Sequence, residues 1–278
     1  MGVLQYLSSV YPSLVAQKLG VTVLTGEGYI AAAIILFLMC ILNFASIKWL
    51  SRWNAVIVWF KVFVPVIVAV CLIYVAFNIH HFYGVGGFMP KGLHGVASAI
   101  SYGGIIFSFA GYARAIVLAG EAKNPQKTIP LVLIGALLIC LSVYFILEVA
   151  FIGSVQPGML THGWGKLNFL GDASPFVGMT HLYHLDGLKN LIFIMAILAP
   201  LGTALIFIAT SSRVAFAMSQ NGYFPKIFKN LNTSGVPYIA VLLNFVIGML
   251  LFFPSPGWQG MVGFLVSAFV LCYLISLL

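Results

Sequence analysis

The residues best suited to chemistry lie between Ser101 and Arg114, in the run SYGGIIFSFAGYAR. Its glycines, Gly103, Gly104 and Gly111, make it a poor continuous helix, since each costs about 1 kcal/mol relative to alanine. An interrupted helix exposes backbone N–H and C=O groups, which are tolerated at membrane depth only where they line a cavity. Many transporters hold charged solutes at such breaks. The alternative is that the glycines permit close packing between helices.

A second candidate is Lys61, a charged residue inside the apolar run 54–77. It lies about 10 Å into that run at 1.5 Å per helical residue. A charge at such depth is costly and usually faces the protein interior, where a lysine can lose its proton readily. The alternative is an anchor that extends its ammonium to the cytoplasmic surface beside Trp53 and Trp59. The sequence leaves both interpretations open.

Thr203 is a third candidate, because it follows Pro200 and Gly202 in another apolar run and could face the same region as Lys61. A hydroxyl that packs between helices is the alternative for this residue.

The sequence lacks the motifs of catalysis, with no P-loop, HExxH, GxSxG or carboxylate pair in its apolar runs. Without such groups an enzymatic reaction has nothing to use, so we expect no enzyme and no cofactor. The four cysteines, Cys40, Cys71, Cys140 and Cys272, lie in apolar runs without a CxxC pair or a neighbouring histidine. They are typical of small buried hydrophobic residues, so we expect no metal site.

Composition identifies lipid as the solvent of most of the chain. Apolar residues make up 62% and charged residues only 6% of the 278 residues, against roughly 45–50% and about 25% in soluble domains. The net charge of +8 comes from scarce acids, and the 13 Lys and Arg residues are scattered. This pattern excludes a disordered chain and predicts no nucleic-acid partner.

Stretches of about 20 apolar residues predict helices that cross the bilayer. The apolar stretches of this chain together predict an all-α polytopic helical bundle, in which the span at about 96–119 is discontinuous. The predicted spans lie at about 28–47, 54–77, 96–119, 128–152, 190–212, 237–253 and 258–278, and residues 3–19 are typical of the end of an eighth helix.

The distribution of Lys and Arg predicts the orientation, because cytoplasmic loops carry the excess. Alternate connections separate two sets of basic residues. One set is Lys48, Arg52, Lys61, Lys123, Lys127, Arg213, Lys226 and Lys229; the other is Lys18, Lys91, Lys166 and Lys189. We therefore expect the loops near 48–53, 120–128 and 213–236 to be cytoplasmic in a multi-pass protein of the cell membrane.

Two ordered motifs carry a family resemblance. The first is FSFAGY at 107–112, followed by AGEAKNP at 119–125 and Ile129-Pro130. The second is SRVAFAMSQNGYFP at 212–225, followed by NTSGVP at 232–237. Together they resemble the sixth span with its following loop, and the cytoplasmic stretch after the eighth span, of the amino acid–polyamine–organocation permeases. The resemblance runs from the end of span three to span ten.

The resemblance implies a LeuT-like fold of two inverted five-helix repeats, with substrate between the broken spans one and six. It places the unwound, substrate-binding part of span six at five residues: Phe107, Ser108, Phe109, Ala110 and Gly111. It also places Lys61 where proton-coupled relatives carry a lysine and sodium-coupled relatives bind an ion. Many relatives have a glutamate after the unwound part, whereas Tyr112, Ala113 and Arg114 follow here. A coupling step that uses that glutamate is therefore not expected.

The activity implied is secondary transport of amino acids by alternating access, with a proton as the coupled ion and sodium as the alternative. We expect residues 1–278 to form one partial permease domain in the lipid bilayer, because the family's first span would precede Met1. A polyamine or other organic-cation permease of the same fold and a non-transporting truncated fragment are the alternative functions.

Overall fold

The computed structural model describes residues 2–18, 21–44, 47–83, 87–101, 105–109, 111–117, 119–160, 167 and 174–252. The chain forms two compact units. The first unit consists of residues 1–57 and 196–278, and the second of residues 58–195. The boundary falls inside two long helices, α3 (Ile47–Ala76) and α9 (Asp186–Gln220).

The first unit begins with a short helix and a hairpin. Helix α1 (Gly2–Leu7) and the 3-10 turn η1 (Pro12–Leu14) precede strands β1 (Val15–Lys18) and β2 (Val21–Leu24). The strands pair antiparallel, with Val15 opposite Leu24. The continuous helix predicted at 3–19 is therefore not present in the described residues. Pro12 lacks the N–H that an α-helix needs after its first turn, and the β-branched valines that follow favour a strand.

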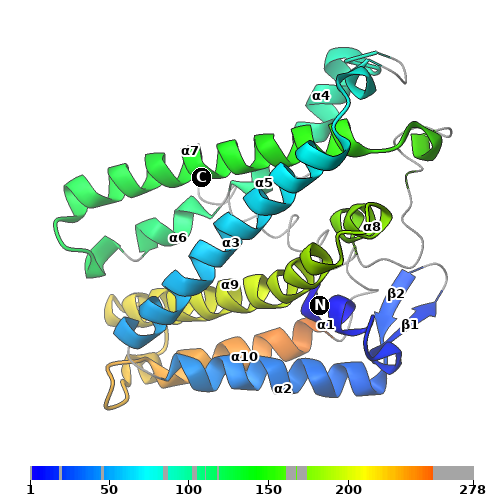
Figure 1. Ribbon diagram of the computed structural model, residues 1–278. Helices are drawn as coiled ribbons and strands as arrows, with labels where there is room; N and C mark the ends of the chain where they lie inside the picture. The colour runs from blue at the N-terminus through cyan, green and yellow to red at the C-terminus, as the bar shows by residue number, and fades with distance from the viewer. Residues whose placement is uncertain are drawn as a thin grey trace. The chain divides into compact units, whose positions relative to one another are not determined.

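Helix α2 (Gly26–Asn43) is the first long helix of this unit. Its N-cap is Thr25, whose hydroxyl accepts a hydrogen bond from the Gly28 amide at 3.1 Å, which satisfies one of the donors that a helix start leaves open. Helix α10 (Tyr238–Phe252) lies beside α2 (Figure 1), with Cys40 and Val241 buried between them. The 3-10 turn η6 (Lys226–Lys229) precedes α10.

In the second unit, α3 continues from Val58 and packs its buried face on the end of α7 (Pro125–Ser154). The shared core includes Leu72 and Ala150, both fully buried. Ser154 donates a hydrogen bond from its hydroxyl to the Leu72 carbonyl at 3.1 Å. An added methyl group at Gly153 would overlap the Phe77 ring, so the two helices approach closely at this point.

Shorter elements complete the second unit. They are η2 (Ile79–Phe82), α4 (Gly92–Ser101), α5 (Ile105–Ser108), α6 (Tyr112–Val117), η3 (Ala119–Glu121), η4 (Pro157–Leu160) and α8 (Pro175–Leu182). Tyr183, at the end of α8, donates a hydrogen bond from its hydroxyl to the Ser154 carbonyl. Burial raises the pKa of the Tyr183 phenol, so the hydroxyl keeps the proton that it donates.

Four described helices are long and apolar enough to cross a membrane: Gly26–Asn43, Arg52–Ala76, Pro125–Ser154 and Asp186–Gln220. They overlap the predicted spans 28–47, 54–77, 128–152 and 190–212. The shorter α10 overlaps the prediction at 237–253. The span predicted at 258–278 lies outside the described residues.

Candidate functional site

The glycine-rich run is divided into separate helical pieces. Helix α4 ends at Ser101, α5 covers Ile105–Ser108 and α6 covers Tyr112–Val117. Phe109 and Gly111 have turn conformation between α5 and α6, whereas Phe107 and Ser108, which were predicted to be unwound, are the last residues of α5. Residues 102–104 and 110 lie outside the described part. At the start of α6, the Arg114 amide donates a hydrogen bond to the Gly111 carbonyl three residues earlier, at 3.1 Å.

A side chain of α7 forms a hydrogen bond with the backbone at the end of α5. The Tyr144 hydroxyl of α7 donates to the Ser108 carbonyl over 3.3 Å. The Phe109 ring packs edge-on against the Tyr144 ring, with 5.4 Å between the ring centroids. The Ser108 hydroxyl donates back to the Ile105 carbonyl at 2.6 Å. Tyr144 thus supplies a partner that the interrupted helix cannot provide for itself.

An open pocket of about 540 Å³ lies at this break. Residues from α5 and the turn after it, from α7 and from α8 line it. They are Ile105, Ser108 and Phe109; Leu141, Tyr144, Phe145, Leu147 and Glu148; and Phe176. Its volume and its mixture of aromatic rings with a few polar groups are those of a site for a small molecule.

Two of the five residues predicted to bind substrate, Ser108 and Phe109, line this pocket. Gly111 is exposed, and a Cβ atom added to it would meet nothing within 4 Å. No neighbouring protein atom therefore requires a glycine there. Ala110 and the side chain of Phe107 lie outside the described residues.

The two residues predicted to couple transport to protons, Lys61 and Thr203, belong to different compact units of the chain. Lys61 is half-buried on α3 in the second unit, and it is not among the residues that line the pocket. Pro65, one turn later, has no N–H to donate to the Lys61 carbonyl, which weakens the helix at this point. Thr203 belongs to the first unit, is exposed, and donates a hydrogen bond to the Ala199 carbonyl at 3.0 Å.

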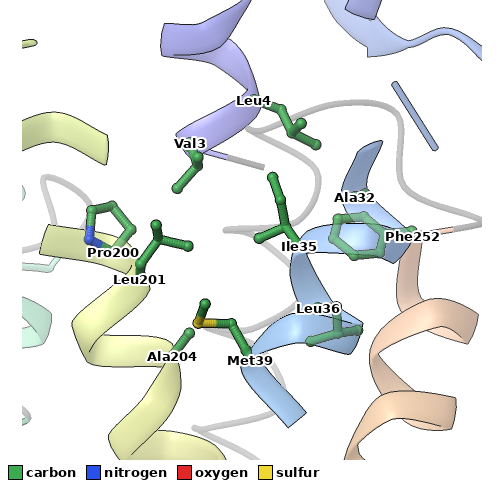
Figure 2. A pocket seen from close by; sticks show the side chains of 11 residues that line it. Val3, Leu4, Ala32, Ile35, Leu36, Met39, Pro200, Leu201, Ala204 and Phe252 are labelled. Atoms are coloured by element: carbon green, nitrogen blue, oxygen red, sulfur yellow. The ribbon is translucent and has the colours of Figure 1, made fainter. Parts of the chain in front are cut away.

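Figure 2 shows a second pocket, in the first unit, with a volume of about 170 Å³. Side chains from α1, α2, α9 and α10 point into it, among them Leu4, Ile35, Leu201 and Phe252. All the residues that line it are apolar. The pocket at the helix break has polar as well as aromatic groups in its lining, so we take it as the candidate functional site.

Sequence reasoning missed Tyr144, Glu148 and Phe176 at this site. Glu148 gave a signal, because it is an ionisable residue inside a predicted span and such residues are functional candidates by default. Tyr144 lies one helical turn before it, on the same face. Phe176 gave no signal, since α8 is brought to the pocket only by the fold.

The long apolar helices and the interrupted helix beside a pocket define an all-α, polytopic membrane protein. The family model described as Amino acid permease matches residues 1–278, and the chain belongs to this family. It is accordingly a multi-pass protein of the cell membrane. Among the residues that the structure describes, no group of three or more His, Cys, Asp or Glu could hold a metal ion.

Several bacterial transporters are similar to this chain. The glutamate/serine transporter AimA of Bacillus subtilis (strain 168) is 35% identical over 236 residues, which are 84% of this chain and 43% of the relative. The aspartate-proton symporter of the same organism is 32% identical over 277 residues, 98% of this chain and 52% of the relative. The D-serine/D-alanine/glycine transporter of Escherichia coli O6:H1 is 24% identical over 75% of this chain and 44% of the relative. The chain spans about half the length of these curated relatives.

Proposed function

We propose that this protein functions in secondary active transport of amino acids, by alternating access, with proton symport. The observation that carries the proposal is the break between α5 and α6 beside a pocket of about 540 Å³. Family membership and the named substrates of the relatives support amino acids as the solute class. The name of the aspartate-proton symporter supports a proton as the coupled ion.

The break suits this function because it offers polar backbone groups inside an apolar segment. Ser108 and the turn residue Phe109 line the pocket in which a solute would lie, and the exposed Gly111 follows shortly after them. Free carbonyls bind cationic groups, and the N-terminus of the next half-helix binds anionic groups. One break can therefore contact both ends of a zwitterion.

The proposal includes the wider architecture that the resemblance implies. The chain forms part of a LeuT-like permease domain, with the loops near 48–53, 120–128 and 213–236 in the cytoplasm. In this arrangement Lys61 on α3 takes up and releases the coupled proton. Its place on an apolar helix, half-buried and one turn before Pro65, supports this role.

The direct test is uptake by the purified protein in proteoliposomes. Radiolabelled serine, glutamate and aspartate are supplied outside, with a pH gradient that is acidic outside, with a sodium gradient, or with neither. Accumulation that requires the pH gradient supports proton symport, and accumulation that requires sodium overturns the proton as coupled ion. Uptake of putrescine in place of all three amino acids would assign the protein to the organic-cation permeases. Absence of any uptake would support a fragment that does not transport.

A further inference from the structure

Glu148 is a carboxylate within an apolar membrane-spanning helix, six residues before the end of α7. A charged side chain in a span is costly, so such residues usually bind a substrate, an ion or a proton. Glu148 lies on the α7 surface that lines the pocket, together with Tyr144 one helical turn earlier. Within the described part of the chain, no hydrogen bond or ion pair engages its carboxylate. The pocket therefore contains an acidic side chain for which the described residues provide no partner.

Aromatic rings surround the same space. Phe109, Tyr144, Phe145 and Phe176 all line the pocket, and they come from three separate parts of the second unit. The face of an aromatic ring attracts cations, and several rings around one space form the cages that bind ammonium groups. The Tyr144 ring is fixed in orientation by its hydrogen bond to the Ser108 carbonyl and by its contact with Phe109.

We propose that Glu148 and these rings form a subsite for the ammonium group of the transported solute. The proposal rests on the proposed function and adds the orientation of the solute. The carboxylate of Glu148 repels the carboxylate of an amino acid, so the amino end faces α7 and the carboxylate end faces away from it. Solutes that lack an ammonium group are poor ligands of this subsite.

The first experiment compares Glu148→Gln with wild type in the purified protein. This change removes the charge and keeps the size of the side chain. We expect the affinity for L-serine, measured by equilibrium binding, to fall roughly tenfold to a hundredfold, as for other hydrogen bonds to charged groups. Glycerate, which has a hydroxyl in place of the serine ammonium, should bind weakly to wild type and no more weakly to the variant.

Glu27→Gln is the matched control, because Glu27 is an exposed glutamate in the first turn of α2 and is not among the residues that line the pocket. It should leave both affinities unchanged. Phe145→Leu removes one ring and retains an apolar side chain, and it should weaken serine binding without affecting the affinity for glycerate. Thermal unfolding of each variant separates loss of the subsite from loss of the fold.

A second probe separates this proposal from the proposed function. Methylammonium contains only the ammonium group, and its binding to wild type and Glu148→Gln can be compared by saturation-transfer NMR in nanodiscs. Glu148-dependent methylammonium binding without uptake of any amino acid would support the subsite and overturn the proposed function. Normal uptake with equal serine affinity in wild type and Glu148→Gln would overturn the subsite alone. Equal affinity combined with loss of pH dependence would make Glu148 a proton carrier and also overturn the subsite.

Discussion

At the scale of single residues, the hydrogen bond from Tyr144 to the Ser108 carbonyl connects the interrupted helix to its neighbour. A helix that ends inside a membrane leaves carbonyls without backbone donors, and each such group is costly in lipid. Tyr144 reduces that cost at one carbonyl and fixes one wall of the pocket. The site therefore depends on a side chain far away in sequence from the glycine-rich run.

Tyr144→Phe removes this hydrogen bond and keeps the ring. A net hydrogen bond contributes about 0.5–1.5 kcal/mol, so we expect solute affinity to fall about twofold to tenfold. Equilibrium binding of labelled amino acid by the purified protein measures the change. Tyr74→Phe is the control, because Tyr74 is 90% exposed on α3. An unchanged affinity in Tyr144→Phe would mean that the Ser108 carbonyl does not shape the binding site.

Gly111→Leu tests whether the backbone at the break meets the solute. An added Cβ at Gly111 meets no protein atom within 4 Å, so the variant should insert and fold as wild type does. Solute binding should be lost, because a side chain would fill the space next to the peptide groups. Gly120→Leu is the control, since an added Cβ there also meets nothing. Wild-type affinity in Gly111→Leu would argue against solute contact at this residue.

Lys61→Ala tests the proton-coupling role. We expect uptake to lose its dependence on an imposed pH gradient, since the variant has no side chain that can carry the proton at this position. Proteoliposome uptake at several external pH values measures this dependence. Arg52→Ala is the control, because it removes an exposed charge from the same helix. Uptake by this variant should still depend on the pH gradient. Proton-driven accumulation in Lys61→Ala would remove Lys61 from the mechanism.

At the scale of elements, small residues set how closely helices approach. In the first unit, a Cβ added at Gly202 of α9 would lie 2.9 Å from the Ile57 Cγ2 atom and 3.2 Å from the Asn54 Oδ1 atom of α3. Small residues allow such approach in membranes, where packing replaces the hydrophobic effect as the driving force. The neighbouring atoms therefore leave no room for a side chain at Gly202, whereas a side chain at Gly111 would meet no protein atom within 4 Å.

Gly202→Leu should therefore destabilise the protein. Overpacking typically costs 1–3 kcal/mol, so we expect a lower midpoint of thermal unfolding in detergent. Gly135→Leu is the matched control on α7, since an added Cβ at Gly135 meets nothing within 4 Å. Its midpoint should stay the same or rise, because leucine favours a helix more than glycine does. Equal unfolding midpoints in the two variants would show that α3 and α9 can move apart at Gly202 without loss of stability.

At the scale of the whole molecule, the distribution of Lys and Arg over the loops predicts the orientation in the membrane. Lys123→Cys lies in a predicted cytoplasmic loop and His80→Cys in a predicted external connection, and both positions are exposed. In sealed cells a membrane-impermeant maleimide should label His80→Cys, and it should label Lys123→Cys only after the membrane is opened. Wild type measures labelling of the native cysteines. The reverse pattern would overturn the orientation inferred from Lys and Arg.

The amino-acid sequence alone was sufficient to predict the class of protein and an interrupted helix between Ser101 and Arg114. Long apolar runs in a chain with few charges predict membrane helices whatever the tertiary packing, because backbone groups must be satisfied locally in lipid. Gly103, Gly104 and Gly111 predicted the interruption, because glycine is an unfavourable residue in a helix. The hairpin at 15–24 was missed because a short apolar run is compatible with both a strand and a helix.

The side chains that surround the break could not be predicted from local sequence and followed from the folded arrangement of the second unit. Tyr144 and Glu148 reach it from α7, and Phe176 reaches it from α8, at sequence distances that no local pattern encodes. Tertiary packing also distinguished Gly202, which contacts its neighbours closely, from Gly111, which faces open space. Helix formation in lipid depends on neighbours in sequence, whereas a binding pocket depends on neighbours in space.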